Sequence, residues 1–361
     1  MSDLFADLLL IRKGGPGMMM GAGPTAVEPI TSPGEWGEKA VALREIFRQT
    51  LGEQPPVECP LDLRVEAETD RGDHIERRYT YQVAPDERVA SLALIPKGLS
   101  GARPGVLCIH STHGWGKLEV VGQGGDLDGS PAPHRAYALD LVRRGYVTFA
   151  PDLLGSGERI YPGRRRFDNE PLYEKHPRWS GTGKDLWDMG RALDVMETMP
   201  EVDRDRIGSI GHSQGGGITC YLMAIDPRIR VGVSNCGLWP HRLNKNPFCV
   251  ARTGWWIGRP ALRSHFLCGK PAPIDFHELF ALAAPRPFLN ISSLAEYQYT
   301  AADEPFTRGA WEDLARNVNK VYALLGAPGA FRLVAHLGEH DFPDDVRADA
   351  YRFIDAALRA G

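Results

Sequence analysis

One serine in the sequence has the surroundings that a nucleophile needs. Ser213 stands in Gly211-His212-Ser213-Gln214-Gly215, a G-x-S-x-G pattern that follows the apolar run 206–211 and precedes apolar residues at helical spacing. A strand that turns sharply into a helix at such glycines lifts the serine above the edge of a sheet. A serine hydroxyl attacks a carbonyl only with a base, a group that orients the base, and donors for the oxyanion. The alternative is a glycine-rich turn in which the serine has no role.

The candidate base is His340, in the segment HLGEHDFPDD at 336–345. This segment follows the last strand pattern and precedes the last helical pattern, which is where a base for Ser213 is expected. The same letters also match H-x-x-E-H, a zinc-peptidase motif that would use His336 as the second ligand. That motif needs a helix to bring both histidines to one face of a metal, and Gly338 and Pro343 oppose a helix here. The sequence therefore predicts a general base and no metal site.

The candidate acid follows the apolar run 287–292. Glu296 lies four residues after Ser292, within reach of His340, whose Nδ1–H it would accept. Asp303 and Glu304 compete for this role in the same connection. We expect Glu296 to be the acid, with Asp303 as the main alternative.

Two backbone N–H groups are expected to hold the oxyanion. One belongs to Gln214, directly after the serine, and the other comes from the segment after the strand pattern at 105–110, where we favour Thr112. His110 and His113 flank this position. Without a third ligand at a recognisable spacing, we interpret both histidines as supporting or lining groups and not as metal ligands.

Short apolar runs alternate with helical patterns from residue 105 to the last helix. Such alternation predicts a mainly parallel sheet covered by helices on both faces. Two connections, 153–183 and 237–286, are too long for simple linkers, and the second is rich in aromatic residues, so we expect them to form a cap over the strand ends. The predicted pocket residues are Trp115, Tyr161, Trp239, Trp255 and Trp256.

The first part of the chain has a different character. Residues 14–35 are rich in Gly and Pro and resemble a loose arm, and apolar residues from Trp36 to Leu51 at helical spacing predict a helix that Gly52 ends. We therefore expect an N-terminal arm and helix over residues 1–60 and a catalytic domain over 61–361. The arm could pack on its own domain or on a neighbour, which leaves a homo-oligomer open.

Composition excludes several partner classes. The 361 residues carry 42 basic and 46 acidic side chains, a net charge of −4, so no field favours nucleic acid or an anionic membrane surface. The six cysteines show neither C-x-x-C pairs nor the density of a disulfide scaffold. No apolar run approaches the roughly 18 residues of a membrane span. The N-terminus has an apolar centre, but Asp3 and Asp7 precede it and no clear small-residue cleavage site follows, so we expect no signal peptide. We expect a cytoplasmic protein.

Taken together and in order, these motifs resemble the α/β-hydrolase superfamily, and within it the dienelactone-hydrolase-like and acetyl-xylan-esterase-like branch. The resemblance extends from about residue 60 to residue 361 and rests on HSTHGWGK (110–117), RGYVTFAPD (144–152), DLWDMGRALDVMETMPEVDRDRIGSIGHSQGGG (185–217), APRPFLNIS (284–292) and HLGEHDFPDDVRADAYRF (336–353). It implies the α/β-hydrolase fold: a mainly parallel sheet of the eight-stranded type flanked by helices, with an N-terminal extension and a cap insertion. It also implies a Ser-His-acid hydrolase without a cofactor, with Ser213, His340, Gln214 and Thr112 at the family's positions. Relatives commonly carry an aspartate after the seventh strand, where this chain has Glu296.

The function expected from these features is the cleavage of carboxylic esters, with small-acyl or acetyl groups, through an acyl-enzyme on Ser213. The partner is then a small-molecule ester. A lactone hydrolase or a peptidase could use the same three residues, although a prolyl-type peptidase needs a large gating domain that residues 1–60 cannot build. A non-catalytic binding protein on the same fold is the alternative from another class.

Overall fold

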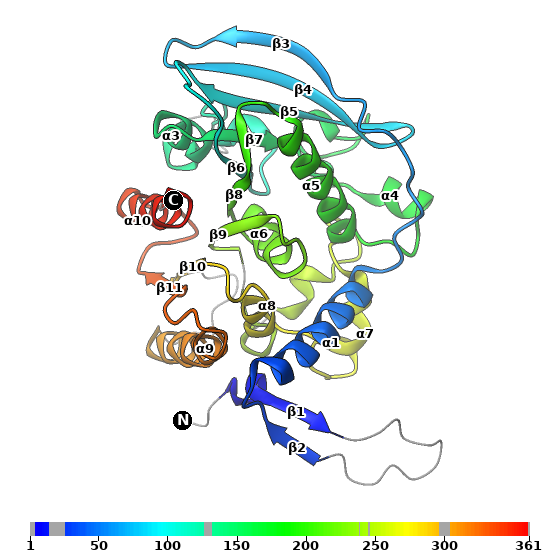
Figure 1. Ribbon diagram of the computed structural model, residues 1–361. Coiled ribbons are helices and arrows are strands. Elements are labelled where there is room, and N and C mark those ends of the chain that lie inside the picture. The colour runs from blue at the N-terminus through cyan, green and yellow to red at the C-terminus, as the bar shows by residue number, and fades with distance from the viewer. Residues whose placement is uncertain are drawn as a thin grey trace.

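A nine-stranded sheet runs through the described part of the chain (Figure 1). The computed structural model describes residues 4–13, 26–125, 132–237, 239–244, 246–295 and 304–359. The strand order is β11-β10-β9-β8-β6-β7-β5-β4-β3, and the six strands from β11 to β7 are parallel to one another. The strands are β3 (Arg64–Asp70), β4 (His74–Ala84), β5 (Glu87–Pro96), β6 (Arg103–Ile109), β7 (Val147–Pro151), β8 (Val202–His212), β9 (Ile229–Asn235), β10 (Phe288–Ser293) and β11 (Phe331–His336).

This topology confirms the predicted mainly parallel α/β sheet. The strands β3, β4 and β5 run antiparallel to their neighbours at one side. Every residue of the outermost strand, β3, is exposed. Val65 and Ala67 alternate with charged residues along this strand, but neither of them is buried, so the alternation does not mark a face that packs on the core.

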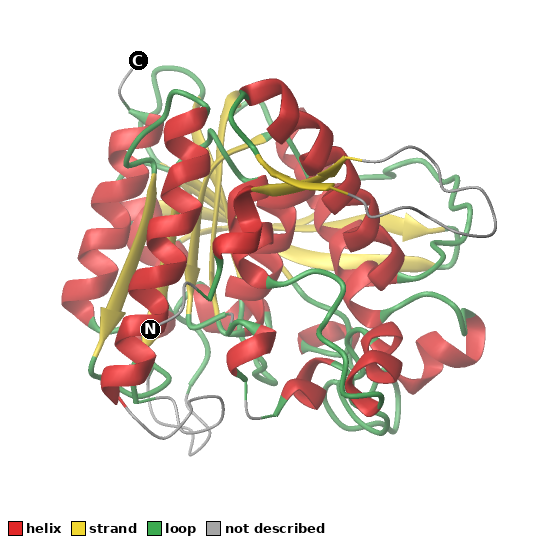
Figure 2. Ribbon diagram, turned by 90° about the horizontal axis from the view of Figure 1, so that it is seen from below, coloured by secondary structure: helices red, strands yellow, loops and turns green. Residues whose placement is uncertain are grey.

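Helices cover both faces of the sheet (Figures 1 and 2). One face carries α1 (Pro33–Leu51), α5 (Gly181–Thr198), α6 (Gln214–Ile225), α8 (Phe276–Leu282) and α9 (Glu304–Leu324), whose apolar residues join one buried cluster. The other face carries α2 (Lys117–Val120), α3 (Tyr137–Arg143) and α10 (Asp344–Leu358), which share a second cluster. Within the described ranges, none of these helices is both long and apolar enough to cross a membrane.

The two long connections contain short helices and are hydrogen-bonded to each other. They hold α4 (Glu170–Lys175), α7 (Arg263–Leu267) and the single turns η3 (Gly157–Arg159), η4 (His241–Leu243), η5 (Pro247–Val250) and η6 (Pro260–Leu262). The side chain of Asn169 donates to the carbonyl of Ile257 at 2.8 Å and accepts from its N–H at 3.1 Å. The N–H of Thr182 donates to Gly258. Outside α5 and α8, the connections 153–183 and 237–286 thus pack together, and we call this part the cap.

The described N-terminal residues pack on their own chain. The turn η1 (Ala6–Leu9) leads into β1 (Leu10–Lys13), which pairs with β2 (Ala26–Pro29). The ammonium group of Lys39 in α1 donates to the carbonyls of Asp7, Leu8 and Leu10 at 2.8–2.9 Å. Phe5 and Leu8 are fully buried in the same cluster as the central helices. This segment therefore contributes to the hydrophobic core.

Candidate active site

Ser213 lies on a strained turn between β8 and α6. Its backbone has φ +55° and ψ −118°, and its N–H donates to the carbonyl of Asn235 at 2.8 Å. A side chain at Gly211 would place its Cβ 2.2 Å from the backbone of Gly215, and one at Gly215 would place it 1.9 Å from the carbonyl oxygen of Ile109. Both glycines are therefore required for the turn. A non-glycine residue with positive φ is costly to hold and is typical of functional sites.

His340 meets Ser213 across the end of the sheet. Its Nε2 lies 2.8 Å from Ser213 Oγ, within hydrogen-bond distance. The histidine belongs to the bend that follows β11, and His336 is the last residue of that strand. His336 Nδ1 accepts from the N–H of Gly338 at 3.1 Å. Because residues 336–340 are not helical, they do not present the two histidines as the H-x-x-E-H motif requires.

The predicted acids Glu296 and Asp303 lie outside the described residues. The segment that leads to them leaves β10 beside the end of β11, the strand that precedes His340. Ser293 is paired with His336, and the N–H of Leu294 donates to the carbonyl of His336 at 2.8 Å. The connection therefore starts next to the bend of His340. The choice between the two carboxylates stays a prediction.

Asn235, at the end of β9, connects the serine turn to the histidine bend. Its buried side-chain amide nitrogen donates to His212 Nδ1 at 2.7 Å and to the backbone carbonyl of Asp341 at 3.0 Å. Its backbone carbonyl accepts from the backbone N–H of Ser213. Sequence reasoning missed this residue. The signal that could have found it is its place at the carboxyl end of a central strand, where α/β proteins gather functional groups.

The ring of His212 lies against the ring of His340, with centroids 4.8 Å apart. Burial, and then the neighbouring His340, hold the pKa of His212 well below its usual range. Its Nδ1 accepts from Asn235, so the proton of the neutral ring is on Nε2. A neutral ring at this position places no positive charge beside His340.

The segment after β6 that contains Thr112 is held by buried polar contacts. His110 Nε2 accepts from the N–H of Leu153 at 2.9 Å, so its Nδ1 carries the proton and donates to the carbonyl of Ser111 at 2.7 Å. The carboxylate of Glu119 accepts from both the N–H and the hydroxyl of Ser111. These contacts give His110 the supporting role that the sequence suggested. Thr112 itself is half-buried.

Ser213, Gln214 and His340 line a cavity of about 110 Å³ between the strand ends and the cap. A single water needs roughly 10–15 Å³ by a comparable measure, so the cavity can hold a small ligand. Trp239 and Trp256 are in its described wall. The other three predicted aromatic residues lie elsewhere: Trp115 is 41% exposed, Tyr161 packs in a separate apolar cluster, and Trp255 lines a shallow depression on the outside of the cap.

Asp185 of α5 is a buried acid in the same wall. Its carboxylate accepts from the N–H of Leu154 at 2.9 Å and from the amide of Gln214 at 3.2 Å. Burial raises the pKa of Asp185 to about 7. The side chain of Gln214 is therefore oriented by a carboxyl group that takes up a proton near neutral pH. The backbone N–H of the same residue is a predicted oxyanion donor.

Comparisons with known proteins find relatives that are described as esterases or hydrolases. The acetyl xylan esterase (AXE1) family model matches residues 184–237, a stretch that contains Ser213. The protein named "Putative hydrolase YtaP" from Bacillus subtilis (strain 168) is 27% identical over 319 residues, which cover 88% of this chain and 98% of that protein. "Carbohydrate esterase MZ0003", from an unknown prokaryotic organism, is 28% identical over 162 residues, covering 42% of this chain and 35% of that protein.

Two solved structures share the fold over almost the whole chain. A glucuronoyl esterase from Solibacter usitatus superposes with a TM-score of 0.72 at 20% identity and covers 91% of this chain and 95% of that one. A promiscuous CE15 esterase from a marine bacterial metagenome gives a TM-score of 0.70 at 18% identity, covering 92% and 94%. The predicted α/β-hydrolase fold is confirmed, and the predicted resemblance to acetyl xylan esterases is confirmed by the family-model match.

Proposed function

We propose that the protein is a carboxylic-ester hydrolase that acts through an acyl-enzyme on Ser213. The observation that carries this proposal is the 2.8 Å contact between His340 Nε2 and Ser213 Oγ, on a strained strand-to-helix turn in the wall of a cavity. The family model and the relatives support it through their names, which describe esterases and a hydrolase.

In the proposed reaction, His340 Nε2 accepts the hydroxyl proton of Ser213 while Oγ attacks the ester carbonyl. The N–H groups of Gln214 and Thr112 donate to the oxyanion, and one such donor is worth about 3 kcal/mol of barrier. The histidine then gives the proton to the leaving alcohol. Water attacks the acyl-enzyme with His340 again as the base, and the acid product leaves. Glu296, with Asp303 as the alternative, accepts the Nδ1–H of His340 and holds the ring.

The substrates proposed are esters with a small acyl group, because the cavity beside Ser213 is small. These steps use only protein groups and water, so they require no cofactor. A lactone is an internal ester and would follow the same steps. A panel of aryl acetates, longer acyl esters and lactones separates these substrates by their kcat/KM values.

A fluorophosphonate probe tests the nucleophile directly. The native protein is expected to be labelled and the Ser213→Ala variant is not. Ser264→Ala, which changes an exposed serine of α7, is the matched control and should label like the native protein. An unlabelled native protein would refute the proposal and favour a non-catalytic binding protein, whereas labelling that survives Ser213→Ala would show that another serine reacts.

The acid is tested by comparing Glu296→Gln with Asp303→Asn. Loss of the group that holds His340 should lower kcat by orders of magnitude, as misorienting a catalytic histidine does. The other substitution should leave kcat within a few-fold of the native value. If both variants keep full activity, the histidine is held by another group.

We also propose a cytoplasmic location. All six cysteines are free thiols, including Cys59 and the exposed Cys268, which suits a reducing compartment. Cell fractionation with a tagged full chain tests this, and recovery from the culture medium would contradict it. Light scattering of the purified chain tests whether the N-terminal arm also supports a homo-oligomer.

A further inference from the structure

The wall of the cavity contains a buried arginine that forms no ion pair with an acid of the described residues. Arg259 is 1% exposed and lies over the rings of Tyr221 and Phe276, at 5.1 and 5.9 Å. Its Nη2 donates to His241 Nε2 at 3.0 Å, and its guanidinium also interacts with the side chain of Tyr221, a neutral partner, while no well-aligned hydrogen bond of Nη1 is found among the described residues. The nearby Asp275 forms its ion pair with Arg242 instead. A buried charge is costly unless an opposite charge accompanies it.

Two further donors in this wall also have no acceptor. Burial, and then the positive charge of Arg259, lower the pKa of His241 to about 3, so its ring is neutral. Because Nε2 accepts from Arg259, the proton of this ring is on Nδ1, which has no partner within the described part of the chain. The buried indole Nε1–H of Trp239 is likewise unmatched there. A buried donor without an acceptor is destabilising, because it has lost its hydrogen bonds to water.

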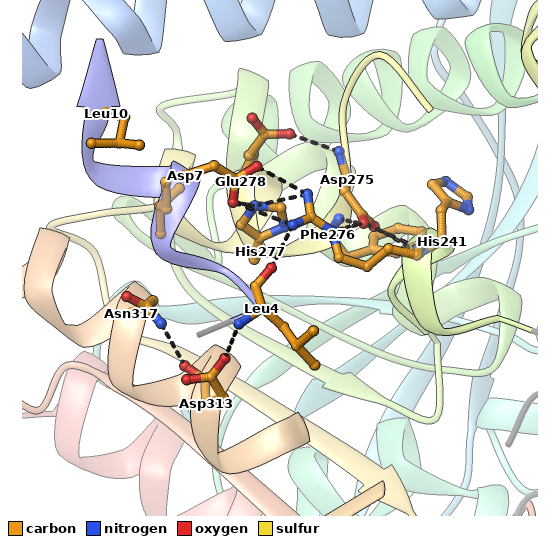
Figure 3. A network of polar contacts seen from close by, with 12 residues as sticks. Leu4, Asp7, Leu10, His241, Asp275, Phe276, His277, Glu278, Asp313 and Asn317 are labelled. Atoms are coloured by element: carbon orange, nitrogen blue, oxygen red, sulfur yellow. Dashed lines mark hydrogen bonds and ion pairs between the residues drawn. The ribbon is translucent and has the colours of Figure 1, made fainter. Parts of the chain in front are cut away.

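The backbone around these donors is fixed by the network of Figure 3. The carboxylate of Asp275 accepts from the N–H of His241 at 2.7 Å and also caps α8. Arg242 bridges Asp275 and Asp7 of the N-terminal segment. This series of contacts from the N-terminal segment holds the backbone of His241 and Arg242 in place beside the cavity.

No acid in the described wall supplies the missing charge. Asp185 lines the same cavity, but its carboxyl group keeps its proton up to a pKa of about 7 and already accepts from Leu154 and Gln214. Below that pH, the described part of the wall therefore holds one full positive charge, and the donors of Arg259, His241 and Trp239 have no charged acceptor there. A carboxylate has two oxygens that accept several hydrogen bonds and carries the opposite charge.

We propose that Arg259, His241 and Trp239 form a subsite for a carboxylate that the ester substrate carries in addition to its ester group. This inference rests on the proposed ester hydrolysis, because Ser213 and Arg259 share one cavity. The substrate class is a small ester with a free carboxylate a few bonds from the ester carbonyl, such as a monoester of a dicarboxylic acid. Arg259 selects this substrate by charge, and Ser213 attacks its ester carbon.

The kinetic test compares mono-4-nitrophenyl glutarate with 4-nitrophenyl valerate, which has the same chain length without the carboxylate, below pH 7. The native enzyme is expected to prefer the charged ester. Hydrogen bonds to a charged group are worth about 1.5–3 kcal/mol, so Arg259→Met should lower the ratio of the two kcat/KM values by roughly 10- to 150-fold. Arg165→Met, which removes an exposed arginine from the outside of the cap, is the matched control and should keep the native ratio. Equal kcat/KM values in the native enzyme would refute the subsite while leaving the hydrolase proposal intact.

A binding measurement tests the subsite without chemistry. Titration calorimetry with glutarate and with its uncharged diamide should show binding of glutarate only by the native protein, and weaker binding by Arg259→Met. Equal binding of the two compounds, or of neither, would overturn the carboxylate subsite. If neither ester is hydrolysed but glutarate still binds, the proposed function fails and the subsite stands.

Discussion

Replacing Asp185 with asparagine should change how the stability of the protein depends on pH. The carboxyl group is buried in α5, and burial raises its pKa from the ordinary value of 3.8 to about 7. Between these pH values the folded protein keeps a proton that the unfolded chain has already lost. Because the native state then binds more protons, this group makes the free energy of unfolding fall as pH rises through that window.

The pKa values give the size of the effect. They differ by about 3, and each unit corresponds to about 1.4 kcal/mol, so Asp185 should remove on the order of 4 kcal/mol between pH 4 and pH 7. The side chain of the Asp185→Asn variant has nothing to ionise, and its amide oxygen can still accept from the N–H of Leu154. The amide of Gln214 can rotate to offer its Oε1, which lacks a partner in the described structure.

Urea denaturation of the native protein and of Asp185→Asn at several pH values measures this. The native protein should lose stability relative to the variant as pH rises from about 4 to about 7, and the difference should be constant above that window. Asp205→Asn, at an exposed position of β8, is the control and should follow the native curve. If the free energy of unfolding depends on pH in the same way for the native protein and for Asp185→Asn, or if their difference has the opposite sign, the carboxyl group is ionised at low pH and the reasoning is refuted.

Three further variants test the positioning of the site. Asn235→Ala removes the amide that joins the serine turn to the histidine bend, and kcat of the ester hydrolysis should fall about 10- to 100-fold with KM changed less and with native circular dichroism. A fall in kcat that matches a loss of folded protein in circular dichroism would instead indicate a general loss of structure. Lys39→Met leaves three carbonyls of the N-terminal segment without the ammonium group that donates to them, so thermal denaturation should show that the free energy of unfolding is lower by about 1–3 kcal/mol. Limited proteolysis should also cut the segment faster. An unchanged melting curve would contradict this. Gly215→Ala drives a methyl group into the carbonyl of Ile109 and should abolish folding or labelling by the fluorophosphonate probe. Gly254→Ala, at a glycine with open space around it, is the control and should change neither. A Gly215→Ala variant that folds and is labelled normally would show that the turn can relax.

The sequence predicted the parts of the molecule that follow a regular pattern. Ser213 and His340 could be placed near each other because each stands at the end of a strand with a clear apolar run, and parallel strands end at one edge. The N-terminal helix could be predicted because the apolar residues from Trp36 onward repeat at helical spacing, and α1 includes them.

Contacts between distant elements could not be predicted in the same way. Asp185 differs from other polar residues of helical segments only in what folds against it, so no local pattern marks it. Asn235 could be placed at the end of a strand pattern, but its contacts with His212 and Asp341 could not be predicted. The same holds for aromatic side chains: Trp239 faces the cavity and Trp255 faces outward, although both belong to the same aromatic-rich connection. Their orientation depends on how the connections 153–183 and 237–286 pack against each other, and the spacing of residues in the sequence does not determine this.

The exposed outer strand of the sheet has a consequence for behaviour at high concentration. Along β3 the unpaired backbone groups of one edge could extend the sheet into a second molecule, which is how edge strands start aggregates. In this chain Arg64, Glu66, Glu68 and Asp70 alternate along that strand, and Arg77 of β4 binds Glu68 at 2.8 Å. If two such edge strands paired in register, parallel or antiparallel, Glu66 and Glu68 of one molecule would face the glutamates of the other. Each of these charges would also lose bound water. The charged edge therefore favours solubility, separately from the chemistry at the carboxyl ends of the parallel strands.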